Sequence, residues 1–455
     1  MAVALAISLV GCDQSLPYRA PGFGLFSKDA PTSRGAPVLL SNSEWWKGLH
    51  DPVLDRLVTL ALARNLNLAV ARERIVAARA ARDAIPGGAA LTSTLRADIT
   101  GSSNSSGTAT NGESRLGLNW MLDPYGARRN QLRAAGARIE IADAEADAAQ
   151  LLVLFNMANA LATLRYNQAL LVQGNAELAQ RQNTLALTRK LASAQSATRM
   201  ETTRARARVA ELQSRLPGQQ AAVAASLNEI AVLAGTGPGG LPDALMQALK
   251  AGGRQPQPGL SPEVGIPADL LRNRPDINIA ERQYYVAVAE IGVARAGLYP
   301  QLSLTGAITL NGLGSGTRTD YFFGPVVAFP ELPAKPAQAR VSARYSAARQ
   351  AHITWKATVL DAILEVENAL VAYQAAAASL ASAQQASQLY LETLGLTREV
   401  FERGEATLGD LIDAEEAVLS AERILIDLRL QHALQFISLN VRLGAGQSKE
   451  ASGTF

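Results

Sequence analysis

Two long stretches without proline constrain this chain more than any other feature of its sequence. Residues 126–191 and 338–403 contain no proline and little glycine. At 1.5 Å per residue, a helix over either stretch would be roughly 100 Å long, which is rare in a compact soluble domain. Apolar residues recur at three- and four-residue intervals, for example at Ile363, Val366 and Leu370. This spacing predicts antiparallel coiled coils.

The sequence is also an internal repeat, with halves at about 51–250 and 251–447. In each half we expect an opening helix, a β-hairpin, a long helix and a closing helix. The ranges expected for these paired elements are 53–84 and 268–298, 89–122 and 301–329, 126–191 and 338–403, and 198–234 and 407–443. Outside the repeat we assign 1–11 as the remnant of a signal peptide, 12–50 as an N-terminal extension and 448–455 as a tail.

The hairpins are predicted from alternating polarity. Leu91, Leu95 and Ile99 fall on one face of the first strand, and Arg96 and Asp98 fall on the other. We therefore expect Arg96 and Asp98 to face a lumen rather than to form a catalytic pair. Four strands cannot close a barrel, which needs about eight, and lipid does not tolerate the open edges of a sheet. The pattern therefore requires at least a dimer.

Composition excludes several classes of function. Aromatic residues are only 5% of the chain, and the net charge is +3 with scattered basic residues, which argues against a nucleic-acid-binding protein. A single cysteine excludes an intramolecular disulfide and any multi-cysteine metal site. The three histidines, His50, His352 and His432, lack the spacing of metal ligands. With no nucleophile–base set either, we expect no enzyme and no metal.

The single cysteine, Cys12, follows an apolar N-terminal stretch that ends in Leu9-Val10-Gly11. This run resembles the lipobox of a bacterial lipoprotein signal, which is cut before the cysteine so that the cysteine becomes acylated. The alternative is a buried apolar strand with an ordinary cysteine, and the absence of Lys or Arg before the apolar stretch departs from the usual signal. Elsewhere no apolar run reaches the approximately 18 residues of a transmembrane helix.

Several further segments resemble one family. They are Trp45-Trp46, Asp51-Pro52-Val53-Leu54-Asp55, Leu122-Asp123-Pro124-Tyr125-Gly126, Ile266-Pro267-Ala268-Asp269-Leu270-Leu271, Arg274-Pro275-Asp276-Ile277, Ile291-Gly292-Val293-Ala294-Arg295-Ala296, Tyr299-Pro300 and Leu411-Ile412-Asp413-Ala414-Glu415. Together they resemble the TolC-like outer-membrane efflux protein family, in its lipoprotein (NodT-type) branch, over residues 12–447.

The resemblance implies an α+β membrane protein that is lipid-anchored in the bacterial outer membrane and extends into the periplasm. It implies a homotrimer with a twelve-stranded β-barrel, a helical tunnel, and no cofactor beyond the covalent lipid on Cys12. The expected partners are outer-membrane lipid, a periplasmic adaptor (membrane fusion protein) and an inner-membrane pump of RND type. The expected function is a passive exit duct for drugs or other toxic small molecules. The alternatives are a duct for type I protein or peptide secretion and a non-conducting, lipid-anchored coiled coil.

The turn after each long helix is the candidate functional region. Gly404 marks the second turn, and Asp410 and Asp413 share one helix face just after it. The resemblance implies that these two aspartates gate the periplasmic mouth. The alternative is that Thr407 and Asp410 form a capping box at the start of the closing helix. The first turn lacks the family's Gly and Asp, and there Glu201 is assigned to the periplasmic tip.

Overall fold

The computed structural model describes residues 15–18, 20–21, 44–86, 90–104, 107–195, 197–259, 274–313, 316–330 and 333–445. The chain divides into two compact units, and both halves of the repeat contribute to each. Unit 1 comprises Met1–Gly22, Arg72–Glu145 and Asp276–Thr358, and unit 2 comprises Phe23–Ala71, Ala146–Pro275 and Val359–Phe455. The predicted lipid site, Cys12, lies outside the described residues.

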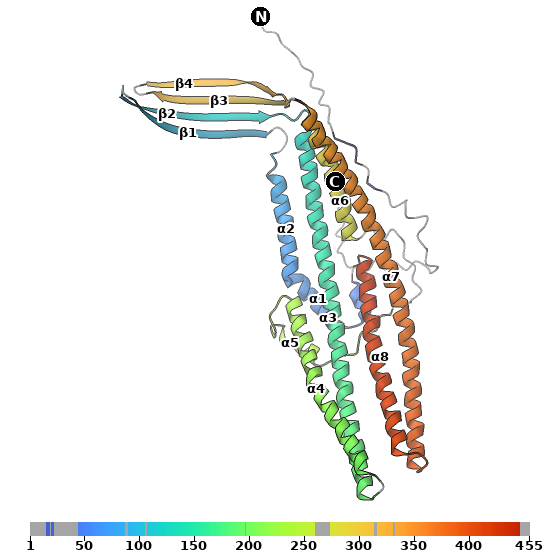
Figure 1. The fold of residues 1–455 in the computed structure, drawn as a ribbon. Helices are drawn as coiled ribbons and strands as arrows, with labels where there is room; N and C mark the ends of the chain where they lie inside the picture. The colour runs from blue at the N-terminus through green and yellow to red at the C-terminus, as the bar shows by residue number, and fades with distance from the viewer. Residues whose placement is uncertain are drawn as a thin grey trace. The chain divides into compact units, whose positions relative to one another are not determined.

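Unit 1 contains one antiparallel sheet of four strands (Figure 1). In spatial order these are β1 (Ala90–Asn104), β2 (Gly107–Met121), β3 (Gln301–Leu313) and β4 (Gly316–Ala328). One row of paired residues across the sheet is Leu95, Leu116, Ile308 and Tyr321. The next row, on the opposite face, is Arg96, Arg115, Thr309 and Asp320. The two predicted hairpins, each with one apolar and one polar face, are confirmed.

The weakest predicted strand contains a proline. Pro325 pairs in register with Leu304 and does not interrupt β4. Because β4 is an edge strand of the sheet, the missing N–H of Pro325 need not cost a ladder hydrogen bond. The fourth strand therefore reaches Ala328 despite its proline.

The predicted long helices are confirmed. α3 (Ala127–Ser193) has 67 residues and α7 (Lys335–Glu402) has 68, and each contributes residues to both units. α4 (Arg199–Leu233) and α8 (Leu408–Arg442), the closing helices, have 35 residues each. One 18-residue stretch of α3 is apolar enough to cross a membrane, but half of it is buried within the structure, as expected for a helix packed against other helices.

The opening helix of the first half differs from the prediction of one helix over 53–84. It is divided at Asn65 into α1 (Pro52–Arg64) and α2 (Leu66–Asp83). Asn65 has an extended ψ of 128°, and its side-chain oxygen accepts hydrogen bonds from two backbone N–H groups at the start of α2. Its amide nitrogen donates to the carbonyl of Leu233 at 2.9 Å. These bonds stabilise the break, which the apolar spacing did not reveal.

The corresponding helix of the second half is α6 (Pro275–Ala296), and residues 260–273, which include part of the predicted helix 268–298, lie outside the described residues. Unit 2 also contains two short helices that the sequence did not predict, η2 (Trp45–Leu49) and α5 (Asp243–Lys250). Both contribute buried apolar side chains to the core of this unit.

A buried ion pair joins three helices of unit 2. Arg165 on α3 donates from Nε to Oδ2 of Asp51 at 2.9 Å, and the two side chains are only 2% and 8% exposed. Asp51 also caps α1 by accepting a hydrogen bond from the backbone N–H of Val53. The carbonyl of Leu249, in α5, accepts from Arg165. Asp51 is therefore both a helix cap and the counter-charge of a buried arginine.

Candidate functional site

The two turns at the ends of the long helices each place one residue in the left-handed region at an equivalent position. Gly404 follows α7 with φ of 75°, and Gln195 follows α3 with φ of 60°. Each lies three residues before a threonine N-cap, which is Thr407 for α8 and Thr198 for α4. The first turn therefore places a glutamine in the left-handed region where the second turn has glycine. The first half lacks a glycine at this turn because Gln195 takes the position that Gly404 has in the second half.

Each turn is followed by a complete capping box. The backbone N–H of Thr407 donates to Asp410 at 2.8 Å, and the Thr407 hydroxyl accepts from the Asp410 N–H at 3.2 Å. The same two bonds join Thr198 and Glu201 at 2.6 Å and 3.2 Å. Hydrogen bonds from the hydroxyl and the backbone N–H of Thr407 lower the pKa of Asp410. Hydrogen bonds from the backbone N–H and the hydroxyl of Thr198 lower the pKa of Glu201. Asp410, one of the two predicted gate residues, and Glu201, assigned to the periplasmic tip, therefore both cap helices.

Asp413, the second predicted gate residue, is exposed. Among the described residues it has no hydrogen bond or ion pair, and it lines a hollow of about 260 Å³ together with Glu201, Arg204 and Arg208. Arg204 and Asp413 each lie six residues after their N-cap threonine. The two turns therefore present a guanidinium and a carboxylate at equivalent positions beside one hollow.

An ionic cluster connects the two helical hairpins beside this hollow; we name it the tip network. Glu416 on α8 lies 2.6 Å from Arg208 on α4 and 3.3 Å from Arg181 on α3. Glu415, the neighbouring residue on α8, lies 3.8 Å from Arg398 on α7. All four helices of the tips are therefore linked by charge. The tip network was not predictable from the sequence, because Arg181 and Glu416 are 235 residues apart and have no local signature.

Arg96 and Asp98 lie on the polar face of β1, as the alternation predicts. The Nε of Arg96 is 2.6 Å from the carboxylate of Asp98, and both side chains are exposed to a large extent. Arg318 and Asp320 repeat this arrangement on β4 at 2.9 Å. The polar face therefore carries short ion pairs on both edge strands. Within the described part of the chain, no cluster of three or more His, Cys, Asp or Glu residues is arranged to hold a metal ion.

Comparison with known proteins extends over the whole repeat. The sequence profile of the outer membrane efflux protein family matches residues 57–236 and 266–445. Nodulation protein T of Rhizobium leguminosarum bv. trifolii is 31% identical over 463 residues, which cover 98% of this chain and 97% of that protein. The cation efflux system protein CusC of Escherichia coli K12 is 26% identical over 464 residues, covering 97% and 98%.

A solved structure supports the same assignment. The outer-membrane channel OprN superposes with a TM-score of 0.82 at 27% identity, over 95% of this chain and 99% of that one. Its likeness includes both the long helices and the hairpins, since the coverage is nearly complete. With both halves of the repeat matched by the profile as well, this chain belongs to the outer membrane efflux protein family, whose place is the bacterial outer membrane.

Proposed function

We propose that three copies of this chain close into one outer-membrane duct. The observation that supports this proposal is the four-stranded sheet. Its apolar face exposes large side chains, with Leu95 79% and Tyr321 87% exposed, while its opposite face carries ion pairs. Within the described chain, β1 and β4 are edge strands. Three copies supply twelve strands, enough to pair every edge and enclose the polar face, with the apolar face toward lipid.

The duct works passively, with energy supplied by an inner-membrane pump of RND type through a periplasmic adaptor. Support comes from what the relatives are named for. One, 27% identical over 97% of this chain, is the toluene efflux pump outer membrane protein TtgC of Pseudomonas putida, and CusC belongs to a cation efflux system. The cargo that fits this group is drugs or other toxic small molecules. No catalytic step is assigned to the chain.

A covalent lipid on Cys12 anchors the N-terminus in the same membrane. The lipobox-like run before this residue supports the assignment. Intact-mass analysis of protein extracted from membranes should show acyl mass on a chain beginning at Cys12. A mature chain that keeps the preceding residues and carries no lipid would contradict it.

The mouth of the duct is gated by the carboxylates of Asp410 and Asp413, near the second turn. Asp413 is exposed and has no partner among the described residues, whereas Asp410 also caps α8. Asp413→Asn should lower cation selectivity and leave thermal stability unchanged, because the residue has no partner among the described residues. Asp410→Asn should lower thermal stability as well, because it breaks the capping box. If Asp413→Asn leaves ion selectivity at the parent value, the gate assignment is wrong.

The duct itself is tested with purified protein in lipid nanodiscs and planar bilayers. Native mass measurement should give a trimer, and bilayer recording should give stable unitary currents. A monomer would contradict closure by three copies. A correctly assembled trimer that conducts nothing would support a structural tether instead.

A further inference from the structure

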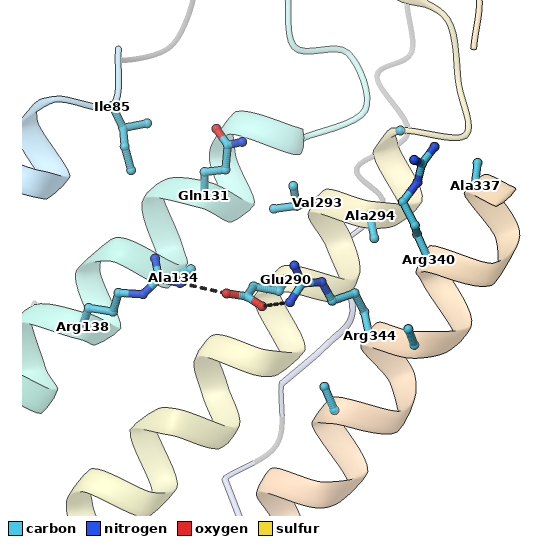
Figure 2. A pocket seen from close by; sticks show the side chains of 13 residues that line it. Ile85, Gln131, Ala134, Arg138, Glu290, Val293, Ala294, Ala337, Arg340 and Arg344 are labelled. Atoms are coloured by element: carbon cyan, nitrogen blue, oxygen red, sulfur yellow. Dashed lines mark hydrogen bonds and ion pairs between the residues drawn. The ribbon is translucent and has the colours of Figure 1, made fainter. Parts of the chain in front are cut away.

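A groove of about 980 Å³ lies in unit 1, next to the ends of the strands. Ile85, just after the end of α2, lines it together with one face each of α3, α6 and α7, and each of these elements neighbours a strand in the chain (Figure 2). On α3 this face is Gln131, Ala134 and Arg138, whose spacing of three and four residues places them in one row. The groove is therefore formed by periodic positions on several helices.

Arginines dominate the charge of the groove. Glu290 on α6 lies between two of them, 2.8 Å from Arg138 on α3 and 2.6 Å from Arg344 on α7 (Figure 2). Arg340, one turn before Arg344, also lines the groove and has no ion pair among the described residues. Three guanidinium groups thus accompany a single carboxylate. Glu290 holds two of them in place across three helices and leaves the third free to bind a ligand.

The rest of the lining is small and apolar. Ala134, Val293 and Ala294 are typical of it, and further alanines come from α7. Alanines on adjoining helices leave the hollow open, since their side chains do not reach across it. A molecule with an apolar body could lie against this surface while an anionic group reaches an arginine, whose planar guanidinium binds carboxylate, sulfonate or phosphate in a bidentate manner.

We propose that this groove binds small amphiphilic anions, molecules with an apolar body and one carboxylate, sulfonate or phosphate group. The groove is lined from Ile85, which follows α2, across to α7. From this span we infer that it lies on the concave side of the layer that these elements form. The inference rests on the proposed function at one point. Closure of three chains turns the concave side toward the duct axis, so that the groove meets cargo rather than lipid.

The test measures binding without relying on conduction. Fluorine NMR of a trifluoromethyl-benzenesulfonate is recorded with the full-chain protein in nanodiscs of zwitterionic lipid, beside the neutral benzyl alcohol and the cationic benzylamine of the same ring. The sulfonate should bind about tenfold more tightly than the alcohol, and the amine should bind most weakly. Arg340→Gln should weaken sulfonate binding about tenfold, as expected for loss of one charge-assisted hydrogen bond.

The matched control is Arg349→Gln. Arg349 lies nine residues further along α7, half a turn away in angle, so it faces away from the groove, and it does not line the groove. This variant loses the same charge from the same helix and should bind the sulfonate as the parent does. Equal binding by the parent and Arg340→Gln, or equal binding of the three probes, would overturn the proposal. Displacement of the sulfonate by phosphatidylglycerol added to the nanodisc would also overturn it, because the groove would then face lipid.

Bilayer currents of the same preparations separate this proposal from the proposed function. A trimer that conducts but does not prefer the sulfonate remains a duct and lacks the anion site. A protein that binds the sulfonate through Arg340 but passes no current keeps the site and loses the assignment as a duct.

Discussion

The tip network predicts how strongly the two helical hairpins are held together. Glu416 on α8 is shared by Arg208 on α4 and Arg181 on α3, so that one carboxylate joins the hairpin α3–α4 to the hairpin α7–α8. If the duct opens by separation of the hairpins, Glu416→Gln should favour the open state. The substitution keeps the size of the side chain and removes only its charge.

The size of the effect follows from the exposure of the three side chains. Arg181 is 11% exposed, whereas Arg208 and Glu416 are 38% and 39% exposed. Fully exposed pairs contribute about 0.2–1 kcal/mol, and breaking a fully buried pair costs about 3–5 kcal/mol. For a cluster between these limits we expect a loss of about 1.5 kcal/mol, which is about a tenfold change in the ratio of open to closed states. Arg208→Gln should have a smaller effect, because Arg181 still pairs with Glu416.

Single-channel recording measures this ratio directly. Glu211→Gln is the control, because Glu211 pairs with Arg215 within α4 and does not connect the hairpins. Glu416→Gln should raise the open probability at least tenfold where the parent is mostly closed, since each of the three chains loses its cluster, and Glu211→Gln should leave it unchanged. If the two variants behave alike, the tip network does not hold the mouth closed.

Substitutions at the buried ion pair and at the two turns test the stability of unit 2. Asp51→Asn retains a capping residue but leaves the buried charge of Arg165 unpaired, so the free energy of unfolding should fall by about 3–5 kcal/mol. Circular dichroism should show this loss as a lower thermal midpoint. Adding Arg165→Met should restore much of the lost stability. Gln195→Gly should stabilise the first turn by about 0.5–1 kcal/mol in chemical denaturation, and Gly404→Gln should destabilise the second turn by a similar amount. Opposite signs at either position would contradict the assignment of equivalent turns.

Helices and strands were predictable because their apolar spacing repeats over many residues. Alternation predicted which residues share a face of the sheet, and a single proline such as Pro325 is accommodated at an edge. The break at Asn65 was not predictable in the same way. The apolar pattern continues through it, and one of the three hydrogen bonds that stabilise the break reaches Leu233, which is 168 residues away.

Among the candidate sites, too, local patterns were predictable from the sequence and contacts between distant segments were not. Thr407 and Asp410 have the spacing of a capping box, and that local pattern was recognised. The equivalent box at Thr198 and Glu201, with glutamate in place of aspartate, has the same local spacing but was not predicted. The tip network and the arginine groove depend on residues from helices far apart in sequence. The sequence shows the charged residues themselves, but only the fold brings them into contact.

The core of unit 2 contains one group whose protonation opposes folding. His432 on α8 stacks on Tyr373 with ring centroids 5.0 Å apart, and burial lowers its pKa. In the unfolded chain its pKa is about 6.5, so below that pH the unfolded state binds the proton more readily. The contribution of neutral His432 to stability is therefore fully present above about pH 6.5 and decreases as the pH falls through and below that value.

His432→Phe keeps a ring against Tyr373 and removes the titrating group. The thermal midpoint of the parent should fall more steeply between about pH 7.5 and 5.5 than that of this variant, because only the parent must keep an imidazole neutral in its core. His50→Gln is the control for the loss of a histidine, since His50 is exposed. If His432→Phe shows the same loss of stability on acidification as the parent, the buried imidazole is not its source. The acid sensitivity would then have to come from another group that titrates in this range, such as His352, whose pKa is also lowered by burial. The capping Asp410 acts only at a more acidic pH, because its pKa is lowered from that of a free aspartate.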